Sequence, residues 1–271
     1  MQGIDLTDTR PDADLDADLG LIREAAREAG ELAMRYFRSD PQVWMKAGDS
    51  PVTEGDLAVD RLLHERLSTA RPDYGWLSEE TADSSERLSA ARTFVVDPID
   101  GTRGFIAGSE EWCVSVAVVE AGRPLAGVLD CPARKEIYAA RLGGGAVCNG
   151  KPIAVREPAG ELRVGGPKPL IQGMPEPSRL CFTAVSYIPS LAYRLAMVAR
   201  GVIDATFIKA NSHDWDLAAA DLILAEAGGR VLDRRGETPF YARRETRHGT
   251  LVAGSGLLLD EMARSIRDME N

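Results

Sequence analysis

The chain has 271 residues, of which 44% are hydrophobic and 27% charged, and its formal net charge is −10. These values are ordinary for a globular protein of one large or two modest domains, and they exclude a disordered or fibrous chain. No run of about 18 apolar residues is present to form a transmembrane helix, and the acidic N-terminal end lacks the basic and apolar segments of a secretory signal. Net acidity disfavours nucleic acid and anionic membranes as partners. The four scattered cysteines are typical of a reduced protein, so we expect a cytoplasmic location.

Residues 1–160 are expected to form an N-terminal α+β half. Six aspartates among residues 1–18 suggest a frayed or capping lead-in rather than an element of the fold. Apolar residues at helical spacing predict a helix over 19–37, which Pro41 stops, and a Thr53-x-x-Asp56 start predicts a second helix through Leu67. A short strand over 93–96 and an antiparallel meander should follow, with Asn149-Gly150 as a hairpin turn. The meander strands are expected over 112–119, 125–129 and 135–140.

Residues 161–271 are expected to form a C-terminal α/β half, which would carry the substrate side. The stretch 160–178 is rich in Gly and Pro and is expected to be a hinge between the halves. Strands and helices then alternate, which is typical of α/β organisation. Strands are expected over 180–184, 203–208, 230–232 and 250–253, and helices over 190–200, over 215–227 and at the C-terminal end.

The most informative stretch is Asp97-Pro98-Ile99-Asp100-Gly101-Thr102, where a predicted strand ends in a tight turn. Pro98 fixes the backbone between two aspartates, so both carboxylates and the carbonyl of Ile99 can point at one place. Gly101 and Thr102 offer backbone N–H groups that suit a phosphate where a helix begins. Taken alone, the two aspartates are equally compatible with an acidic surface turn.

Three further sites offer carboxylates. Glu79 follows an apolar segment, Asp216 opens a helix with a face of small residues, and Asp56 lies in the first turn of the second helix. Each has a simpler reading, as a solvated loop acid or as a carboxylate that complements a helix dipole. If all converge, their charges require cations, and oxygen ligands without a His or Cys cluster favour Mg²⁺ or Mn²⁺ over zinc.

Two motifs in this order carry a specific resemblance. Asp97-Pro-Ile-Asp-Gly-Thr102 and Trp215-Asp216-Leu-Ala-Ala-Ala-Asp, the latter followed by Ala-Gly-Gly229, resemble the signature motifs of the inositol monophosphatase superfamily of Mg²⁺-dependent, lithium-sensitive phosphatases. The resemblance runs from the first predicted helix to the last. It implies an α-β-α-β-α layered sandwich and hydrolysis of a phosphomonoester of a small metabolite. It also implies two or three Mg²⁺ ions, for which Mn²⁺ can substitute, and it leaves a homodimer open.

The resemblance also assigns roles to residues. The side chains of Glu79, Asp97, Asp100 and Asp216 and the carbonyl of Ile99 look like metal ligands. Glu79 and Thr102 would orient the attacking water, with Asp56 beside Thr102. Gly101, Thr102, Ser190 and Lys209 would face the substrate.

Within the superfamily, the sequence is closest to the branch that hydrolyses 3'(2'),5'-bisphosphate nucleotides. Lys46-Ala-Gly-Asp-Ser-Pro-Val-Thr53 and Leu77-Ser-Glu-Glu80 resemble that branch, whereas the segment Gly143–Ile153 is closer to inositol monophosphatases. Arg103-Gly104-Phe105 departs from the Lys-Glu-Phe that usually follows Asp-Gly-Thr in the nucleotidases. Lys209 stands seven residues before Asp216, where inositol monophosphatases place a glutamate. A cation there suits a second substrate phosphate, although a solvated lysine at a strand end is the simpler reading.

Adenosine 3',5'-bisphosphate, converted to AMP and phosphate, is therefore the favoured substrate, with inositol 1-phosphate as the alternative. A phosphatase for a sugar bisphosphate or for histidinol phosphate is a third candidate, although Lys209 disfavours a substrate amine. A non-catalytic regulator that keeps the fold and binds a protein or RNA is a further one, which the intact set of carboxylates disfavours.

Overall fold

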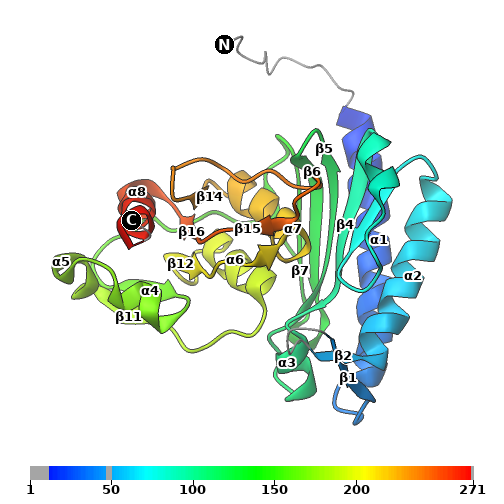
Figure 1. Ribbon diagram of the computed structural model, residues 1–271, viewed down its shortest axis with the longest axis horizontal. Coiled ribbons are helices and arrows are strands. Elements are labelled where there is room, and N and C mark those ends of the chain that lie inside the picture. The colour runs from blue at the N-terminus through cyan, green and yellow to red at the C-terminus, as the bar shows by residue number, and fades with distance from the viewer. Residues whose placement is uncertain (1–11, 47–50, 270–271) are drawn as a thin grey trace.

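The structure, a computed structural model, describes residues 12–46 and 51–269. It consists of five layers in which helices and sheets alternate (Figure 1). Helices α1 and α2 cover the outer face of a seven-stranded sheet, and α6 and α7 fill the space between that sheet and a five-stranded one. Helices α4, α5 and α8 lie at the far end. The predicted α-β-α-β-α sandwich is confirmed.

Eight α-helices lie in the described part of the chain: α1 (Asp12–Tyr36), α2 (Glu54–Ala70), α3 (Thr102–Ile106), α4 (Lys168–Gln172), α5 (Glu176–Arg179), α6 (Leu191–Ala199), α7 (Asp214–Glu226) and α8 (Gly256–Met269). Two 3₁₀ helices are η1 (Ser85–Ser89) and η2 (Pro132–Arg134).

The seven-stranded sheet has the order β3-β4-β5-β6-β7-β8-β9. Strand β3 runs parallel to β4, and every later neighbour pairs antiparallel, so the predicted meander is confirmed. Its strands are β3 (Gly75–Ser78), β4 (Arg92–Asp100), β5 (Cys113–Glu120), β6 (Arg123–Cys131), β7 (Glu136–Arg141), β8 (Ala146–Cys148) and β9 (Lys151–Pro152).

The five-stranded sheet has the order β11-β10-β12-β16-β14. Strand β10 pairs parallel with β11 and β12, and β16 pairs antiparallel with β12 and β14. Its strands are β10 (Leu162–Gly165), β11 (Phe182–Ala184), β12 (Ala205–Ile208), β14 (Arg230–Asp233) and β16 (Leu251–Gly254). Two small ribbons complete the strands: β1 (Val43–Met45) with β2 (Pro51–Thr53), and β13 (Ser212–His213) with β15 (Arg247–His248).

The buried apolar side chains form three clusters between the layers. One lies between α1, α2 and the large sheet, the largest packs α6 and α7 against that sheet, and the third lies under α8. Burial of this kind is the main favourable term in folding, which is why the outer helices α1, α2 and α8 turn an apolar face toward a sheet.

Local signals in the sequence act as expected at two sites. Thr53 caps α2, and Asp56 accepts a hydrogen bond from the Thr53 amide in return, which is the predicted capping box. Asn149 and Gly150 both have positive φ between β8 and β9, as a tight hairpin turn requires.

One expectation was wrong. Helix α1 already begins at Asp12, so residues 12–18 are not a frayed or capping lead-in, whereas residues 1–11 lie outside the described residues. Asp18 is buried and bonds to Arg71 and Arg92, which ties the first turns of α1 to the sheet and to α2. The Gly- and Pro-rich stretch holds β10, α4 and α5, and its role as a hinge stays a prediction. The division into halves at residue 160 stays a prediction.

No helix among the described residues combines the length and the apolar character needed to cross a membrane.

Candidate active site

A bulge in β4 places two aspartates on the same face of the sheet. Asp97 pairs with Ser115 and Asp100 pairs with Cys113, so three steps along β4 oppose two steps along β5. Residues three apart in a regular strand point to opposite faces, and the one extra residue of a bulge restores them to the same face. Pro98 is tolerated there because a bulge interrupts the ladder of N–H donors.

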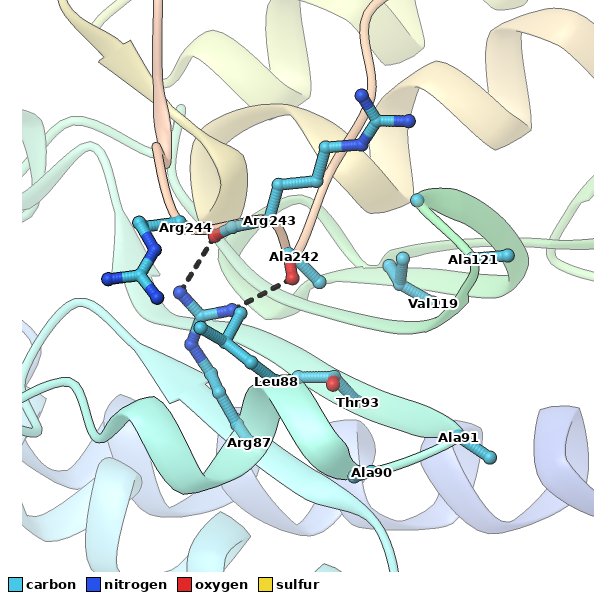
Figure 2. Close-up of a pocket in the computed structure, with 11 residues that line it drawn as sticks. Arg87, Leu88, Ala90, Ala91, Thr93, Val119, Ala121, Ala242, Arg243 and Arg244 are labelled. Atoms are coloured by element: carbon cyan, nitrogen blue, oxygen red, sulfur yellow. Dashed lines mark hydrogen bonds between the residues drawn. The ribbon is translucent and has the colours of Figure 1, made fainter.

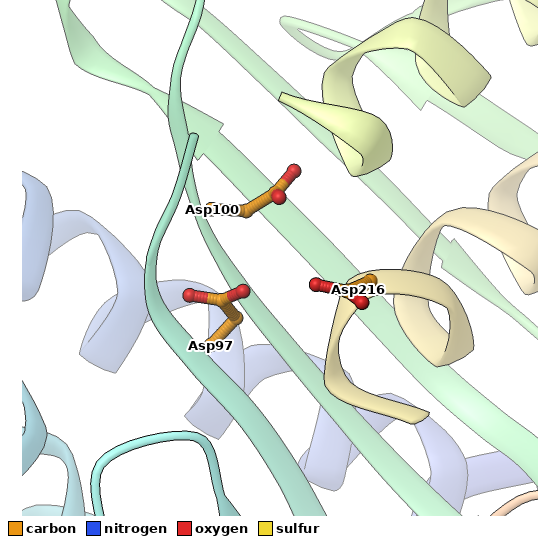
Figure 3. A group of neighbouring side chains, drawn as sticks. All are labelled: Asp97, Asp100 and Asp216. Atoms are coloured by element: carbon orange, nitrogen blue, oxygen red, sulfur yellow. The ribbon is translucent and has the colours of Figure 1, made fainter. Parts of the chain in front are cut away.

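Asp216, from the first turn of α7, completes a cluster with these two aspartates. Figure 3 shows the three carboxylates pointing toward one another, and one oxygen from each lies within 4.8 Å of the others. Burial, together with the negative charges of neighbouring carboxylates, raises the pKa of Asp97 and of Asp216 well above the ordinary value. Such crowded oxygens are ligands for a hard divalent cation, so the donor set fits Mg²⁺.

The N-terminus of helix α6 holds the Asp100 side chain in place. The Asp100 carboxylate accepts hydrogen bonds from the amide of Ala192, at 2.7 Å, and from the hydroxyl of Ser190. Burial still raises the pKa of Asp100, to about 6, because these donors offset only part of the desolvation. The Ser190 side chain is fully buried and also caps α6 through the amide of Tyr193, so it positions Asp100 rather than offering its hydroxyl to solvent.

Asp56 and Thr102 come together as the resemblance implied. The Thr102 hydroxyl lies 3.2 Å from Asp56 Oδ1 and 3.1 Å from the carbonyl of Ile99. Burial raises the pKa of Asp56 to about 6, although hydrogen bonds from Thr53 and Thr102 lower it. Gly101, which precedes Thr102, has a φ of 94°, and a Cβ there would lie 3.1 Å from Ser190. Only glycine therefore allows the end of β4 and the N-terminus of α6 to approach so closely.

Glu79 lies beside this cluster, and its charge raises the pKa of Asp97, Asp100 and Asp216. Its carboxylate is engaged by Lys46, whose Nζ lies 2.7 Å from Glu79 and 2.9 Å from Glu80. Residues 47–50, part of the sequence stretch that favoured the nucleotidase branch, lie outside the described residues. Lys46 thus supplies a positive charge beside Glu79.

Lys209 follows β12 and is exposed, and its charge lowers the pKa of Asp216. The structure adds a second cation, Arg194 of α6, which the sequence reasoning missed. The Arg194 Nε is buried without a hydrogen-bond partner, and among the described side chains no carboxylate lies within ion-pair distance of its guanidinium. Burial lowers its pKa, while the nearby charge of Asp100 raises it. The sequence signal that could have identified Arg194 was its position one helical turn after Ser190.

Comparisons with known proteins identify the family of this chain. The profile of the inositol monophosphatase family matches residues 14–270. A histidinol-phosphatase of Chlorobaculum parvum is 34% identical over 81% of this chain and 86% of its own length. An inositol-1-monophosphatase of Mesorhizobium japonicum is 30% identical over 92% and 96%. A 3'(2'),5'-bisphosphate nucleotidase of Aggregatibacter actinomycetemcomitans is 28% identical over 83% and 87%.

A solved inositol monophosphatase from Thermotoga maritima superposes with a TM-score of 0.81, at 28% identity, over 94% of this chain and 98% of its own. Members of the matched family are metal-dependent phosphatases, and this chain places three acidic side chains where a metal could bind. The fold, the paired motifs and the comparisons converge: the chain belongs to the inositol monophosphatase family, and it is a metal-dependent phosphomonoesterase.

Proposed function

We propose that the substrate of this phosphatase carries a second phosphate group, and that adenosine 3',5'-bisphosphate is hydrolysed to AMP and phosphate. The observation that carries the proposal is Arg194, a cation beside Asp100 with a buried Nε that no described group satisfies. An unsatisfied buried donor is costly, so such a group is expected to gain a partner when substrate binds.

The chemistry at the first phosphate would rest on the acidic cluster. Glu79, Asp97, Asp100 and Asp216, with the carbonyl of Ile99, would hold Mg²⁺. When bound, Mg²⁺ would lower the pKa of a water and stabilise negative charge on the leaving oxygen. The number of ions is part of the proposal, with two or three expected.

This chain's own residues would orient the water and receive its proton. The Thr102 hydroxyl would align the water for in-line attack together with Glu79. A proton taken up at Thr102 Oγ1 can pass to Asp56 Oδ1, 3.2 Å away, because burial has raised the pKa of Asp56 to about 6. The amide of Gly101 would contact the phosphate.

The second phosphate would meet Arg194 and Lys209. Two cations on the substrate side suit a dianion better than the neutral hydroxyls of a polyol. Tyr187, in the loop before α6, is 75% exposed and close enough for its phenol to affect the pKa of Arg194. An exposed aromatic ring beside the phosphate-binding cation is compatible with a nucleoside base.

Inositol 1-phosphate is the second candidate, because the inositol-1-monophosphatase relative covers almost the whole chain. The histidinol-phosphatase relative raises histidinol phosphate as well. Lys209 disfavours both, since a cation repels the amine of histidinol phosphate and replaces the glutamate that the family resemblance associates with inositol hydroxyls.

A phosphate-release assay with Mg²⁺ tests the proposal. The purified chain is offered adenosine 3',5'-bisphosphate, inositol 1-phosphate, fructose 1,6-bisphosphate and histidinol phosphate at matched concentrations. We expect the highest kcat/KM for the nucleotide. A higher kcat/KM for inositol 1-phosphate or histidinol phosphate would refute the second-phosphate assignment.

Variants of the two cations sharpen this test. Loss of one charge-assisted contact is worth roughly 1.5–3 kcal/mol, so Arg194→Met or Lys209→Glu should lower kcat/KM for the bisphosphate about 10- to 150-fold. Activity on inositol 1-phosphate should hold, and Lys209→Glu could raise it. Arg194→Lys and Lys209→Arg keep the charge and serve as controls. Equal losses on both substrates would mean that these residues support the fold or the metals instead.

A further inference from the structure

A cavity of about 420 Å³ lies at the opposite end of β4 from the acidic cluster, and none of the roles above uses it. Its floor is formed by η1 and the start of β4, one wall by the turn between β5 and β6, and its roof by residues 242–244 (Figure 2). The lining is apolar below and cationic above. Its members are Arg87, Leu88, Ala90, Ala91, Thr93, Val119, Ala121, Gly122, Ala242, Arg243 and Arg244.

Every charged residue of this lining is an arginine, in a chain whose net charge is −10. Arg87 is not available to a ligand, because it pairs with Asp83 and donates to the carbonyls of Ala242 and Arg243, at 2.8 and 2.9 Å. These bonds, drawn as dashed lines in Figure 2, hold the roof over the floor. The buried arginine therefore fixes the backbone that presents its two exposed neighbours.

Arg243 and Arg244 differ from Arg87 in lacking a counter-charge. Throughout residues 12–46 and 51–269, no carboxylate lies within ion-pair distance of either guanidinium. Glu245, next in sequence, is turned toward the amide of Arg247. Arg243 is also held in place, because its guanidinium stacks 3.7 Å above the Phe240 ring. Figure 2 shows Arg244 extending on the side of Arg87 and Arg243 extending away from it, so the two charges flank the roof.

We propose that this cavity binds a small organic phosphate, with its apolar portion on the floor of Leu88, Ala90 and Ala91 and its phosphate on the guanidinium of Arg244, while Arg243 adds positive charge at the other side of the roof. Guanidinium groups suit phosphate because they present several donors in a fixed plane. The apolar floor offers a contact surface that inorganic phosphate cannot use, so we expect the ligand to carry a ring or a short hydrocarbon as well as its phosphate.

The roof of the cavity is directly bonded to the helix that carries Asp216. The amide of Ala242 donates to the Asp214 carboxylate at 2.7 Å, and the amide of Asp214, the first residue of α7, donates to the carbonyl of Thr246 at 2.9 Å. A ligand that clamps the roof to the floor therefore restrains this backbone. Binding of a ligand in the cavity would therefore also restrain the first residue of α7.

Binding of phenylphosphonate, which phosphatases cannot hydrolyse, tests the proposal. The titration is run with EDTA, so that no divalent ion draws the probe to the acidic cluster. We expect phenylphosphonate to bind more tightly than inorganic phosphate and than benzyl alcohol, which lack the ring and the phosphate respectively. Equal affinity of inorganic phosphate, or of benzyl alcohol, would overturn the assignment.

The double variant Arg243→Met/Arg244→Met should weaken binding of phenylphosphonate about tenfold or more. Arg23→Met/Arg264→Met removes the same charge from exposed positions elsewhere and should leave the affinity unchanged. Equal weakening in both would show a general charge effect and refute the site. In the wild-type chain, the probe should also slow hydrogen exchange at the amides of Ala242 and Asp214, and unchanged exchange there would refute the link to α7.

Discussion

Asp130 offers a direct test of the electrostatics of this fold, away from the acidic cluster. It lies on β6, is only 7% exposed, and faces α1 at Gly30, where a Cβ would come within 1.9 Å of its Oδ2. Within the described part of the chain, no hydrogen bond reaches its carboxylate. Burial and the charge of Glu31 raise the pKa of Asp130 to about 7, and Arg27 offsets this only partly.

The shift from 3.8 to about 7 sets both the sign and the size of the expected effect. Between these values the folded chain keeps a proton on Asp130 that the unfolded chain has lost, so stability falls as the pH rises through this window. About three units correspond to roughly 4 kcal/mol at most. Asp130→Asn removes the penalty, so it should raise the free energy of unfolding by about 2–4 kcal/mol at pH 8 and leave it nearly unchanged at pH 4.

Urea denaturation followed by tryptophan fluorescence, at pH 4, 6 and 8, measures this difference. Asp73→Asn, at an exposed position, is the matched control and should change stability little at any of these pH values. An Asp130→Asn chain that is less stable than wild type at pH 8, or equally stabilised at pH 4 and pH 8, would refute the reasoning.

Three further predictions concern the acidic cluster. Asp216→Asn should lower turnover roughly 100-fold or more while raising the thermal stability of the metal-free chain, because it relieves repulsion with Asp100 and Glu79, and a variant with normal turnover would exclude Asp216 from the metal site. Gly101→Ala should destabilise the chain by about 1–3 kcal/mol and impair turnover, because alanine would have to adopt a positive φ and its Cβ would press against Ser190. Urea denaturation measures the first effect and phosphate release the second. Li⁺ should inhibit phosphate release with a potency that depends on the Mg²⁺ concentration, because a single charge cannot replace the divalent ion, and full activity in Li⁺ would place the chain outside the lithium-sensitive group.

The sequence predicted the elements whose signals are local. The meander, the capping box at Thr53 and the hairpin at Asn149 each depend on neighbouring residues, and each is found. The lead-in was mistaken because the helical start at Asp12 is stabilised by a distant contact, from Asp18 to Arg71 and Arg92, that no local pattern reveals.

The site shows the same division between local and distant information. The motif predicted that Asp97 and Asp100 would point at one place from a tight turn, and the structure achieves this with a bulge in β4. The burial of Ser190, by contrast, follows from the packing of α6 against Asp100. The Arg194 guanidinium likewise comes near the charge of Asp100 only when α6 docks on the sheet. Roles that depend on docking of distant segments were thus the ones that the sequence could not resolve.

The position of Asp216 depends on small residues that lie one turn further along α7. A Cβ on Gly127, in β6, would come within 2.9 Å of the carbonyl of Ala219, so the helix backbone rests directly on the sheet. Helix α7 is buried along most of its length because it lies between two sheets, and the run Ala218–Ala220 keeps it slim enough for that place. Contact at Ala219 fixes the depth of the helix, and Asp216 precedes it by three residues. The carboxylate can therefore meet Asp97 and Asp100 only because side chains that carry no chemistry are small.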